Sequence, residues 1–152
     1  MASPRKTTSP TGLALIRAAE AFSPVVYLCP AGKRTIGYGH VLRGDESFPR
    51  KITREQAEAL LIDDLAPVEI YLHAVFPDLP QERFNALVSL CFNIGLGAFE
   101  KSTLFARLKA GDIPGAASQF ARWIYADGKI QPGLVKRRAV ERALFLIPET
   151  AP

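Results

Sequence analysis

Hydrophobic positions near the start of the chain follow a helical period. Behind a polar stretch, apolar residues recur at a three-residue spacing, and the run closes on a single acid, Glu20. The residues with this spacing are Leu13, Ile16 and Ala19. The pattern predicts a helix over residues 11–22, ending before Pro24 because the residue preceding a proline disfavours helical geometry. Residues 1–9 are polar and are predicted to form a flexible tail.

Two β-type runs follow this helix. "VVYL" and "RTIGYGHVL" are rich in β-branched and aromatic residues, and "CPAGK" between them supplies the Pro and Gly of a turn. They predict a hairpin within a small antiparallel sheet of two or three strands over residues 25–42.

From residue 52 the helical period returns and lasts longer. Thr53 and Gln56 have the spacing of a capping box at the start of this helix. Its apolar stripe consists of Leu61, Leu65, Val68, Leu72 and Val75. Pro67 lies inside the pattern and is expected to kink the helix or divide it, because proline lacks the N–H of a helical hydrogen bond.

Another long helix is predicted after "PDLP", and Gly95 and Gly97 are expected to stop it. Its predicted buried face consists of Phe84, Leu87, Val88, Cys91 and Phe92. Further helical segments are expected at about residues 99–110, 114–126 and 132–147, with Gly111 and Gly128 as stop signals. In the last segment the apolar stripe is Val135, Ala139, Ala143 and Leu146, and the basic flank is Lys136, Arg137, Arg138 and Arg142.

The succession of a helix, a small sheet and a helical bundle predicts an α+β protein that is mainly α, with a cleft where the sheet meets the bundle. The chain has 152 residues, 48% of them hydrophobic and 22% charged, as expected for one folded domain over residues 10–152. It contains no apolar stretch near the ~18 residues of a membrane span. The amino terminus has no signal-peptide pattern, so synthesis in the cytoplasm is expected.

The net charge of +4 is compatible with a polyanionic partner, including an anionic cell envelope, and equally with a basic surface that has no specific partner. No dense Lys/Arg run with interleaved aromatic residues appears, so no nucleic-acid partner is predicted. Of the two cysteines, Cys91 lies in an apolar run and is expected to be buried and inert, whereas Cys29 lies among turn residues. A disulfide between them is conceivable.

The segment from residue 20 to residue 40 holds the candidate chemistry. A general acid must hold a proton near neutral pH, and burial beside an apolar side chain such as Phe22 favours the protonated form of a carboxyl. A lone Glu is more commonly a solvated surface residue. The hairpin after Glu20 can fold back so that Cys29 and Thr35 face this acid across a groove.

Glu20, Cys29 and Thr35, separated by eight and by five residues and followed by "IGYGH", resemble the signature of the phage-type lysozymes of glycoside hydrolase family twenty-four. The resemblance continues through "FNIGLGAFEKSTL", "FARW" and "GLVKRRAVERALF" and covers about residues 11–147. It implies a lysozyme-like fold with a β lobe at about 23–50. A long helix would join this lobe to a helical lobe at about 68–147, which packs with the first helix.

The resemblance also implies an activity. The substrate would be bacterial peptidoglycan, and the reaction hydrolysis of the β-1,4 bond between N-acetylmuramic acid and N-acetylglucosamine, with inversion. Glu20 would be the general acid, and Thr35 would hold the attacking water. Position 29 is an aspartate in many members, so the thiol of Cys29 acts either as a partial thiolate or as a polar placeholder.

Other positions acquire roles only through the resemblance. His40 would form a structural ion pair with Asp64; a solvent-exposed or catalytic histidine is the alternative. Arg137 or Arg138 would approach Glu20, in a contact expected to be loose because a cation opposes protonation. Phe92 and Ser102 would line the cleft, although Phe92 also suits the core. Trp123 is expected in the core rather than in contact with sugar.

As an endolysin, the chain would lyse the host of a phage or prophage. It would stay in the host cytoplasm until lysis, depend on a separate holin for membrane passage, and act as a monomer without a metal or cofactor. Its basic carboxyl-terminal segment, with Arg137, Arg138 and Arg142, also suits contact with lipopolysaccharide. The alternatives are a catalytically weakened peptidoglycan-binding module, which Cys29 favours, and a basic helical nucleic-acid binder, which explains neither Glu20 nor the hairpin.

Overall fold

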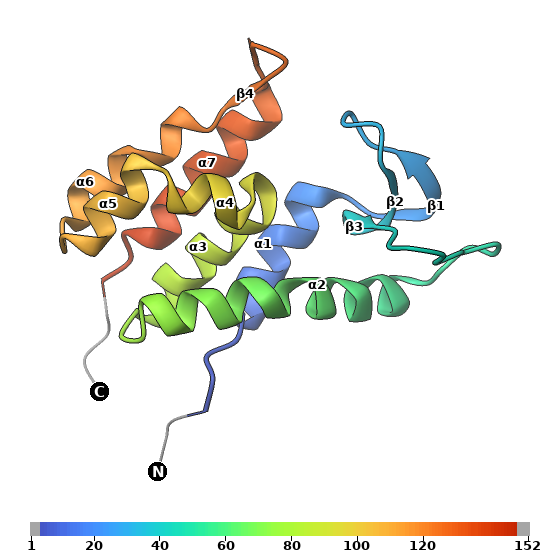
Figure 1. The fold of residues 1–152 in the computed structure, drawn as a ribbon, viewed down its shortest axis with the longest axis horizontal. Helices are drawn as coiled ribbons and strands as arrows, with labels where there is room; N and C mark the ends of the chain where they lie inside the picture. Colours follow the sequence, from blue (N-terminus) through green and yellow to red (C-terminus); the bar gives the residue numbers. More distant parts are fainter. Residues whose placement is uncertain (1–3, 149–152) are drawn as a thin grey trace.

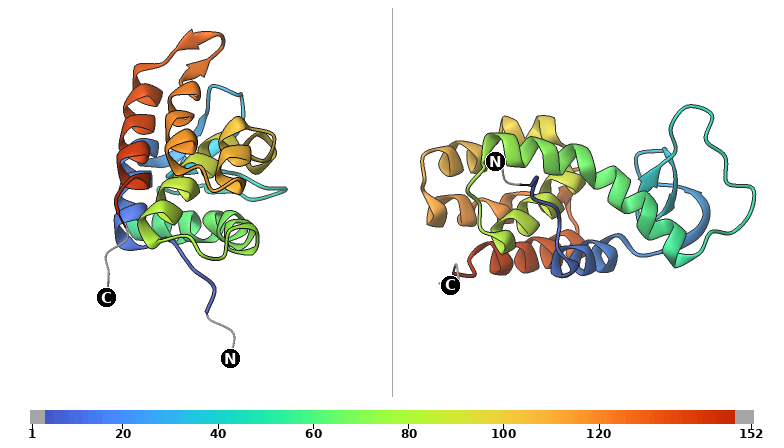
Figure 2. Two further views of the ribbon diagram at one scale, coloured as in Figure 1. Left: turned by 90° about the vertical axis from the view of Figure 1, so that its left-hand side faces the viewer. Right: turned by 90° about the horizontal axis from the view of Figure 1, so that it is seen from below.

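A long helix, α2 (Arg54–Val75), runs the length of the molecule and connects its two lobes (Figures 1 and 2). We describe residues 4–148 of this computed structural model. The predicted capping box is present, since Thr53 Oγ1 accepts from the N–H of Gln56 while the Gln56 side chain accepts from the N–H of Thr53. Pro67 does not divide the helix, and it lies on the exposed side of it.

The small lobe is built on the predicted hairpin. Strands β1 (Ser23–Leu28), β2 (Arg34–Gly37) and β3 (His40–Val41) form an antiparallel sheet in that order. Tyr27 pairs with Thr35, and Ile36 pairs with His40. The inner residues of β2 are buried, so the sheet packs against the amino-terminal half of α2.

The large lobe surrounds α3 (Gln81–Ile94), in which eight consecutive residues from Phe84 to Cys91 are buried. A helix buried on all sides is typical of the centre of a bundle. Helix α1 (Pro10–Glu20), α2 and α7 (Pro132–Phe145) all pack against it. The aliphatic and aromatic side chains of these helices form one continuous core.

The segment expected as one helix over 99–110 is two helices. Helix α4 (Leu96–Glu100) ends before Ser102, whose hydroxyl oxygen accepts from the N–H of Phe105 and thereby caps α5 (Thr103–Lys109). A serine at this position ends one helix and begins the next because its side chain replaces a helical hydrogen bond.

The prediction of a helix over residues 114–126 is wrong in its second half. Helix α6 (Ile113–Ser118) is followed by a 3₁₀ turn, η1 (Phe120–Arg122), and then by a hairpin of β4 (Tyr125–Ala126) and β5 (Lys129–Ile130). Asp127 and Gly128 connect the two strands with φ of 52° and 74°. Asp-Gly is a preferred pair for such a tight turn, so Gly128 marks a hairpin and not a helix end.

The face predicted to be buried on α7 is the exposed one. Val135 and Leu146 are 42% and 40% exposed, and Ala139 and Ala143 are also exposed. The buried side of the helix carries the three charged residues Arg137, Arg138 and Glu141, together with Leu144 and Phe145. The apolar periodicity failed here because the charged side chains compensate one another inside the protein.

The amino-terminal segment is not a free tail over the part that the structure describes. The buried carboxylate of Glu69 on α2 accepts from the backbone N–H of Thr8 at 2.7 Å and from its hydroxyl at 2.6 Å. Arg5 Nη1 lies 3.1 Å from the other oxygen of this carboxylate. Residues 5–9 therefore hold α1 against α2; residues 1–3 lie outside the described range.

Within residues 4–148, none of the helices has both the length and the apolar character needed to cross a membrane. Cys29 and Cys91 are both free thiols, so the conceivable disulfide is absent.

Candidate active site

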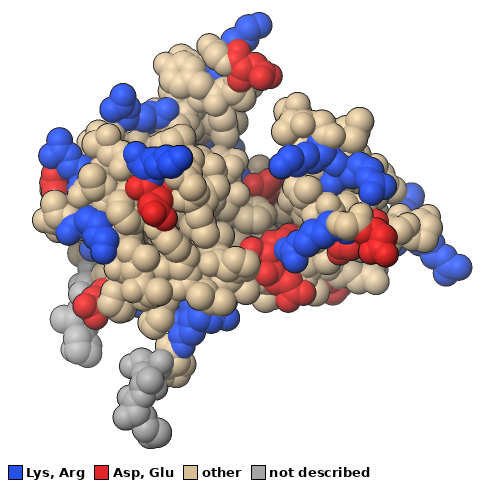
Figure 3. Space-filling model, viewed as in Figure 1, with Lys and Arg blue, Asp and Glu red and all other residues tan. Residues whose placement is uncertain are grey.

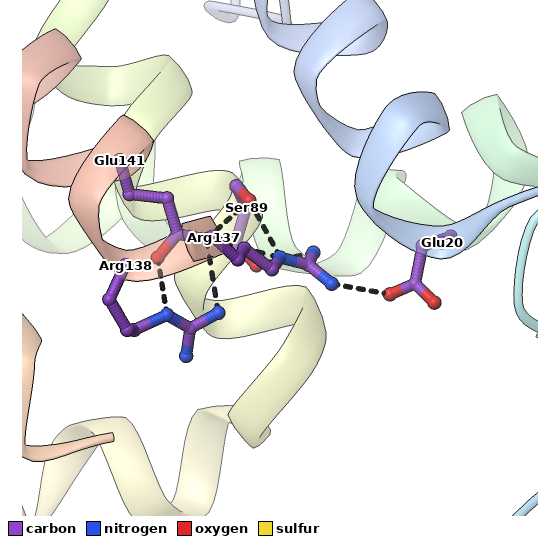
Figure 4. A network of polar contacts seen from close by, with 5 residues as sticks. All are labelled: Glu20, Ser89, Arg137, Arg138 and Glu141. Atoms are coloured by element: carbon purple, nitrogen blue, oxygen red, sulfur yellow. Dashed lines mark hydrogen bonds and ion pairs between the residues drawn. The ribbon is translucent and has the colours of Figure 1, made fainter. Parts of the chain in front are cut away.

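Glu20 is the last residue of α1, at the point where the chain turns toward the sheet. The next residue, Ala21, has a φ of 58° and redirects the backbone into β1. The Glu20 side chain is 20% exposed, and its Oε1 accepts a hydrogen bond from Nη1 of Arg137 at 2.8 Å (Figure 4). Of the two candidate arginines, Arg137 makes this contact, and the contact is direct where a loose one was expected.

Gly39 closes the other side of the Glu20 carboxyl. Its φ is 77°, and a Cβ at this position would lie 2.7 Å from Glu20 Oε2. A side chain here would push the carboxyl away, and the positive φ would strain any residue other than glycine. Gly39, the second glycine of "IGYGH", therefore leaves room for the Glu20 carboxyl as well as forming the turn.

Cys29 lies at the end of β1, in the turn that leads to β2. Its carbonyl oxygen accepts from the N–H of Gly32 at 2.8 Å, and its own N–H donates to the carbonyl oxygen of Lys33 at 3.0 Å. Hydrogen bonding to the backbone at Lys33 is the main cause that lowers the pKa of the Cys29 thiol. Burial opposes this effect, while the backbone at Ala31, the Thr35 side chain and the charge of Lys33 add to it.

Thr35 is 2% exposed on β2, and its hydroxyl donates to the Lys33 carbonyl oxygen at 2.9 Å. A hydroxyl has one proton, so in this rotamer the Thr35 oxygen is free to accept from the thiol or from a water molecule. Position 35 is thus held by the same turn that holds position 29.

Tyr27 lies near both the acid and the thiol. Burial raises the pKa of Tyr27, and the charges of Glu20 and Cys29 raise it further. All three side chains therefore lie within electrostatic reach of one another. The sequence contained a usable signal for Tyr27, because residues two apart at the end of a strand share a face.

A cleft of about 630 Å³ lies between the acid and the turn that carries the thiol. Glu20, Arg137 and Pro30, the neighbour of Cys29, belong to its walls. Figure 3 shows the hollow between the lobes, with acidic atoms inside it and basic atoms on the surfaces to either side. The turn of the β4–β5 hairpin, at Ala126 and Asp127, completes the rim.

Two further hollows continue the cleft along the large lobe. The first, of about 510 Å³, shares Asn93, Ala126 and Leu134 with the cleft. The second, of about 450 Å³, shares Arg122 and Trp123 with the first. A single groove therefore leads from Glu20 past Trp123.

The expected cleft residues have different positions in this groove. Ser102 lines its far end, where its hydroxyl also donates to the Phe99 carbonyl oxygen at 2.6 Å. Phe92 is half-buried against the core and does not line these three hollows, whereas its neighbour Asn93 does. Trp123 packs against the core and also lines the groove.

Comparisons with known proteins agree with this arrangement. The family described as phage lysozyme matches residues 17–141. The endolysin of Acyrthosiphon pisum secondary endosymbiont phage 1 is 43% identical over 142 residues, which are 90% of this chain and 96% of that protein. The chain belongs to the phage lysozyme family.

Two further relatives of this lysozyme-family chain show how far the likeness extends. The muramidase domain of SpmX from Asticaccaulis excentricus has a TM-score of 0.84 and 36% identity, over 95% of this chain and 100% of that domain. The endolysin of Bacillus phage B103 is 40% identical over 146 residues, which are 93% of this chain but 55% of that protein. Both lobes and the groove therefore lie within the family's fold.

The expected contact between His40 and Asp64 is present. His40 is buried, and its Nδ1 lies 2.8 Å from Asp64 Oδ2 on α2. Its other ring nitrogen lies 3.1 Å from Glu46 Oε1, and Arg43 bridges the two carboxylates. The backbone N–H of Arg43, followed by the His40 side chain, lowers the pKa of Glu46. These contacts fix β3 to α2; Glu46 and Arg43 are residues that the sequence did not reveal.

Replacing Gly39 tests how closely the acid is packed. We expect Gly39→Ala to displace the Glu20 carboxyl and to lengthen its 2.8 Å contact with Arg137 beyond hydrogen-bonding distance, as seen in a crystal structure of the variant. The matched control is Gly111→Ala, which has the same φ of 77° but no neighbouring atom within 4 Å. Both variants should lose about 1 kcal/mol of stability. An intact contact in Gly39→Ala would contradict the packing argument.

The two thiols should differ in reactivity. We expect iodoacetamide to modify Cys29 at least about tenfold faster than Cys91 in the native protein near neutral pH, because the reagent attacks thiolates. The pKa of Cys29 is lowered, whereas burial, with a smaller contribution from the charge of Glu141, raises the pKa of Cys91. Mass spectrometry of the digested protein measures both sites, and unfolding should equalise them. Equal native rates would contradict the environment assigned to Cys29.

Proposed function

We propose that this chain is an N-acetylmuramidase that hydrolyses the β-1,4 bond between N-acetylmuramic acid and N-acetylglucosamine in peptidoglycan, with Glu20 as the general acid. Membership of the phage lysozyme family makes it a glycosidase of the lysozyme type and a peptidoglycan hydrolase of phage lysis. One observation supports the residue assignment most strongly. Glu20 presents its carboxyl to the cleft with one oxygen bound to Arg137 and the other, Oε2, without a hydrogen-bond partner among the described residues.

The proposed reaction begins with a proton transfer. Glu20 donates its proton to the oxygen that links the two sugars, so that this oxygen leaves with the bonding electron pair as a hydroxyl. The Glu20 carboxylate that remains is stabilised by Arg137, whose Nη1 already points at Oε1. Arg137 therefore favours the state after proton donation, which is the direction that the reaction requires.

A water molecule then attacks the sugar carbon from the side of the turn. The lowered pKa of Cys29 increases its thiolate fraction, which stabilises positive charge on the sugar and accepts a proton from the water. The Thr35 hydroxyl oxygen accepts a hydrogen bond from the same water and orients it. Attack from the face opposite to the leaving oxygen gives inversion.

The biological setting belongs to the same proposal. We assign the protein a stage in the host cytoplasm, passage with the help of a holin, and action on the cell wall as a monomer. Contact with lipopolysaccharide through Arg137 and Arg138 has no support, since both side chains are buried; Lys136 and Arg142 are the exposed basic residues of α7. The alternative of a binding module without turnover remains the competing hypothesis.

Product analysis tests the reaction and its acid together. Wild type should release new muramic-acid reducing ends from purified peptidoglycan, identified by mass spectrometry. Glu20→Gln, which keeps the shape but carries no transferable carboxylic proton, should be slower by about 100- to 10,000-fold. Binding without product from the wild type would indicate the binding module, and anhydro-sugar or peptide products would indicate another reaction.

Substitutions at position 29 test the thiol. We expect Cys29→Ala to lose activity by on the order of 100-fold, and Cys29→Asp to remain within about tenfold of the wild type, because the carboxylate restores a negative charge beside the water. Cys91→Ala is the control that removes the other thiol. Turbidity clearing of peptidoglycan gives the rates, and equal rates for wild type and both Cys29 variants would exclude a role for the thiol.

A further inference from the structure

A buried cluster of charged side chains stands behind the acid. Arg137, Arg138 and Glu141 come from α7, and Ser89 comes from α3 (Figure 4). All four are buried, and Glu141 is 0% exposed. Of these four residues, only Arg137 lines the cleft.

Three contacts fix the orientation of Arg137. Its Nε lies 3.3 Å from both Ser89 Oγ and Glu141 Oε2, and its Nη2 donates to the Ser89 carbonyl oxygen at 3.1 Å. The Ser89 hydroxyl donates to the same Glu141 carboxylate. With these groups engaged, Nη1 is directed at Glu20 (Figure 4). A guanidinium is planar, so fixing one edge fixes the direction of the other.

Arg138 completes the cluster. Its Nε lies 2.7 Å from Glu141 Oε1, and its Nη2 donates to Oε2 at 3.2 Å. Its Nη1 is buried without a hydrogen-bond partner among residues 4–148. An unpartnered donor in a buried ion pair costs stability, and buried ion pairs seldom repay the loss of hydration. The cluster thus calls for an explanation other than stability.

The charged groups of this cluster act on one another and on Glu20. Two guanidinium groups, of Arg137 and Arg138, and two carboxyl groups, of Glu141 and Glu20, meet in this one cluster. Burial raises the pKa of Glu141, while Arg138, Ser89 and Arg137 oppose this. Burial likewise lowers the pKa of Arg138, on which the charge of Glu20 also acts. The charge of Glu20 therefore interacts with Arg138, a side chain that does not line the cleft.

We propose that Glu141 and Arg138 are positioning residues that act on Glu20 through Arg137. Glu141 orients Arg137 and cancels part of its charge, and Arg138 limits this cancellation by occupying the far side of the Glu141 carboxylate. Their balance sets the pH at which Glu20 gains or loses its proton. The effect of these two residues on catalysis rests on the proposed function of Glu20 as the acid. Their effect on the titration of Glu20 does not depend on that function.

The two residues should have opposite effects. Glu141→Gln removes a negative charge, leaves two uncompensated cations and favours ionised Glu20, so the midpoint of its titration should fall. Arg138→Met removes a positive charge, lets Glu141 cancel more of Arg137 and favours protonated Glu20, so the midpoint should rise. Each shift should be on the order of half a pH unit, less than the 1–3 units of a charge in direct contact, because Arg137 and neither of these two residues makes the ion pair with Glu20.

Other titratable groups lie near Glu20 and Glu141. The charges of Glu20 and Cys29 act on Tyr27 of β1, and the charge of Glu141 acts on Cys91 of α3. Tyr27 and Cys91 both have raised pKa values and remain neutral through the acidic and neutral range. The Cys29→Ala background removes the remaining thiol that titrates near the cleft.

The experiment follows the ¹³C carboxyl resonance of Glu20 by NMR as a function of pH, with Glu20→Gln to assign the signal. Glu141→Gln should lower the midpoint and Arg138→Met should raise it. Glu141→Asp and Arg138→Lys keep the charges and should restore the wild-type midpoint. Glu55→Gln, an exposed site that makes the same chemical change, should leave the midpoint unchanged. Midpoints that stay constant, or that shift in the same direction in both charge-removing variants, would overturn the proposal.

Peptidoglycan hydrolysis as a function of pH then separates this proposal from the proposed function. If both proposals hold, one limb of the pH–rate profile coincides with the titration of Glu20. That limb should move to lower pH in Glu141→Gln and to higher pH in Arg138→Met. If wild type and Glu20→Gln release no reducing ends but the NMR midpoints still move oppositely, the coupling holds and the assigned function fails. If Glu141→Gln does not fold, Arg138→Met compared with Arg138→Lys decides the question alone.

Discussion

The ion pair between Arg137 and Glu20 joins the last helix of the chain to the first, across 117 positions in the sequence. Buried polar groups are usually hydrogen-bonded, and the nitrogens of the Arg137 guanidinium meet this requirement with Ser89 on α3, Glu141 on α7 and Glu20 on α1. This requirement fixes three helices relative to one another. The acid is therefore placed by the same contacts that close the core of the large lobe, and the site cannot be altered independently of the packing behind it.

The small lobe depends on a second set of contacts. His40 lies between Asp64 and Glu46 and ties β3 to α2, while the inner residues of β2 cover the beginning of that helix. Because α2 continues unbroken through Pro67, one continuous helix connects the sheet with the bundle. The hairpin with Cys29 and Thr35 is thereby held on one side of the cleft, with the acid on the other side.

The thiol shows how local backbone structure compensates for the identity of a side chain. A carboxylate at position 29 would carry its charge without help. Cysteine acquires part of that charge because the turn presents backbone hydrogen bonds and the Lys33 cation to the sulfur. Cys91 has the same chemistry but lies in an apolar helix, where burial keeps it neutral. The pKa values of the two thiols therefore differ because of their surroundings, since the residue type is the same.

The sequence by itself determined the elements that depend on near neighbours: the first helix, the hairpin, the capped start of α2 and the long helix α3. The first helix ends at Glu20, two residues before the predicted end. These signals are local, since a cap, a turn or a helical period involves residues only a few positions apart. Likeness to a family added the spacing of Glu20, Cys29 and Thr35 and the His40–Asp64 pair. The Asp127–Gly128 pair also indicates a hairpin turn, but the apolar residues before it favoured the prediction of a helix.

Only the tertiary structure decided which arginine meets Glu20, and that the buried face of α7 is the charged one. Apolar periodicity assumes that charges face water, because an isolated charge is costly to bury. On α7 that cost is offset by partners on α3 and α1, which no window of the sequence around α7 contains. The arrangement of the acid depends on contacts between distant segments, so it emerged only when those segments were placed together.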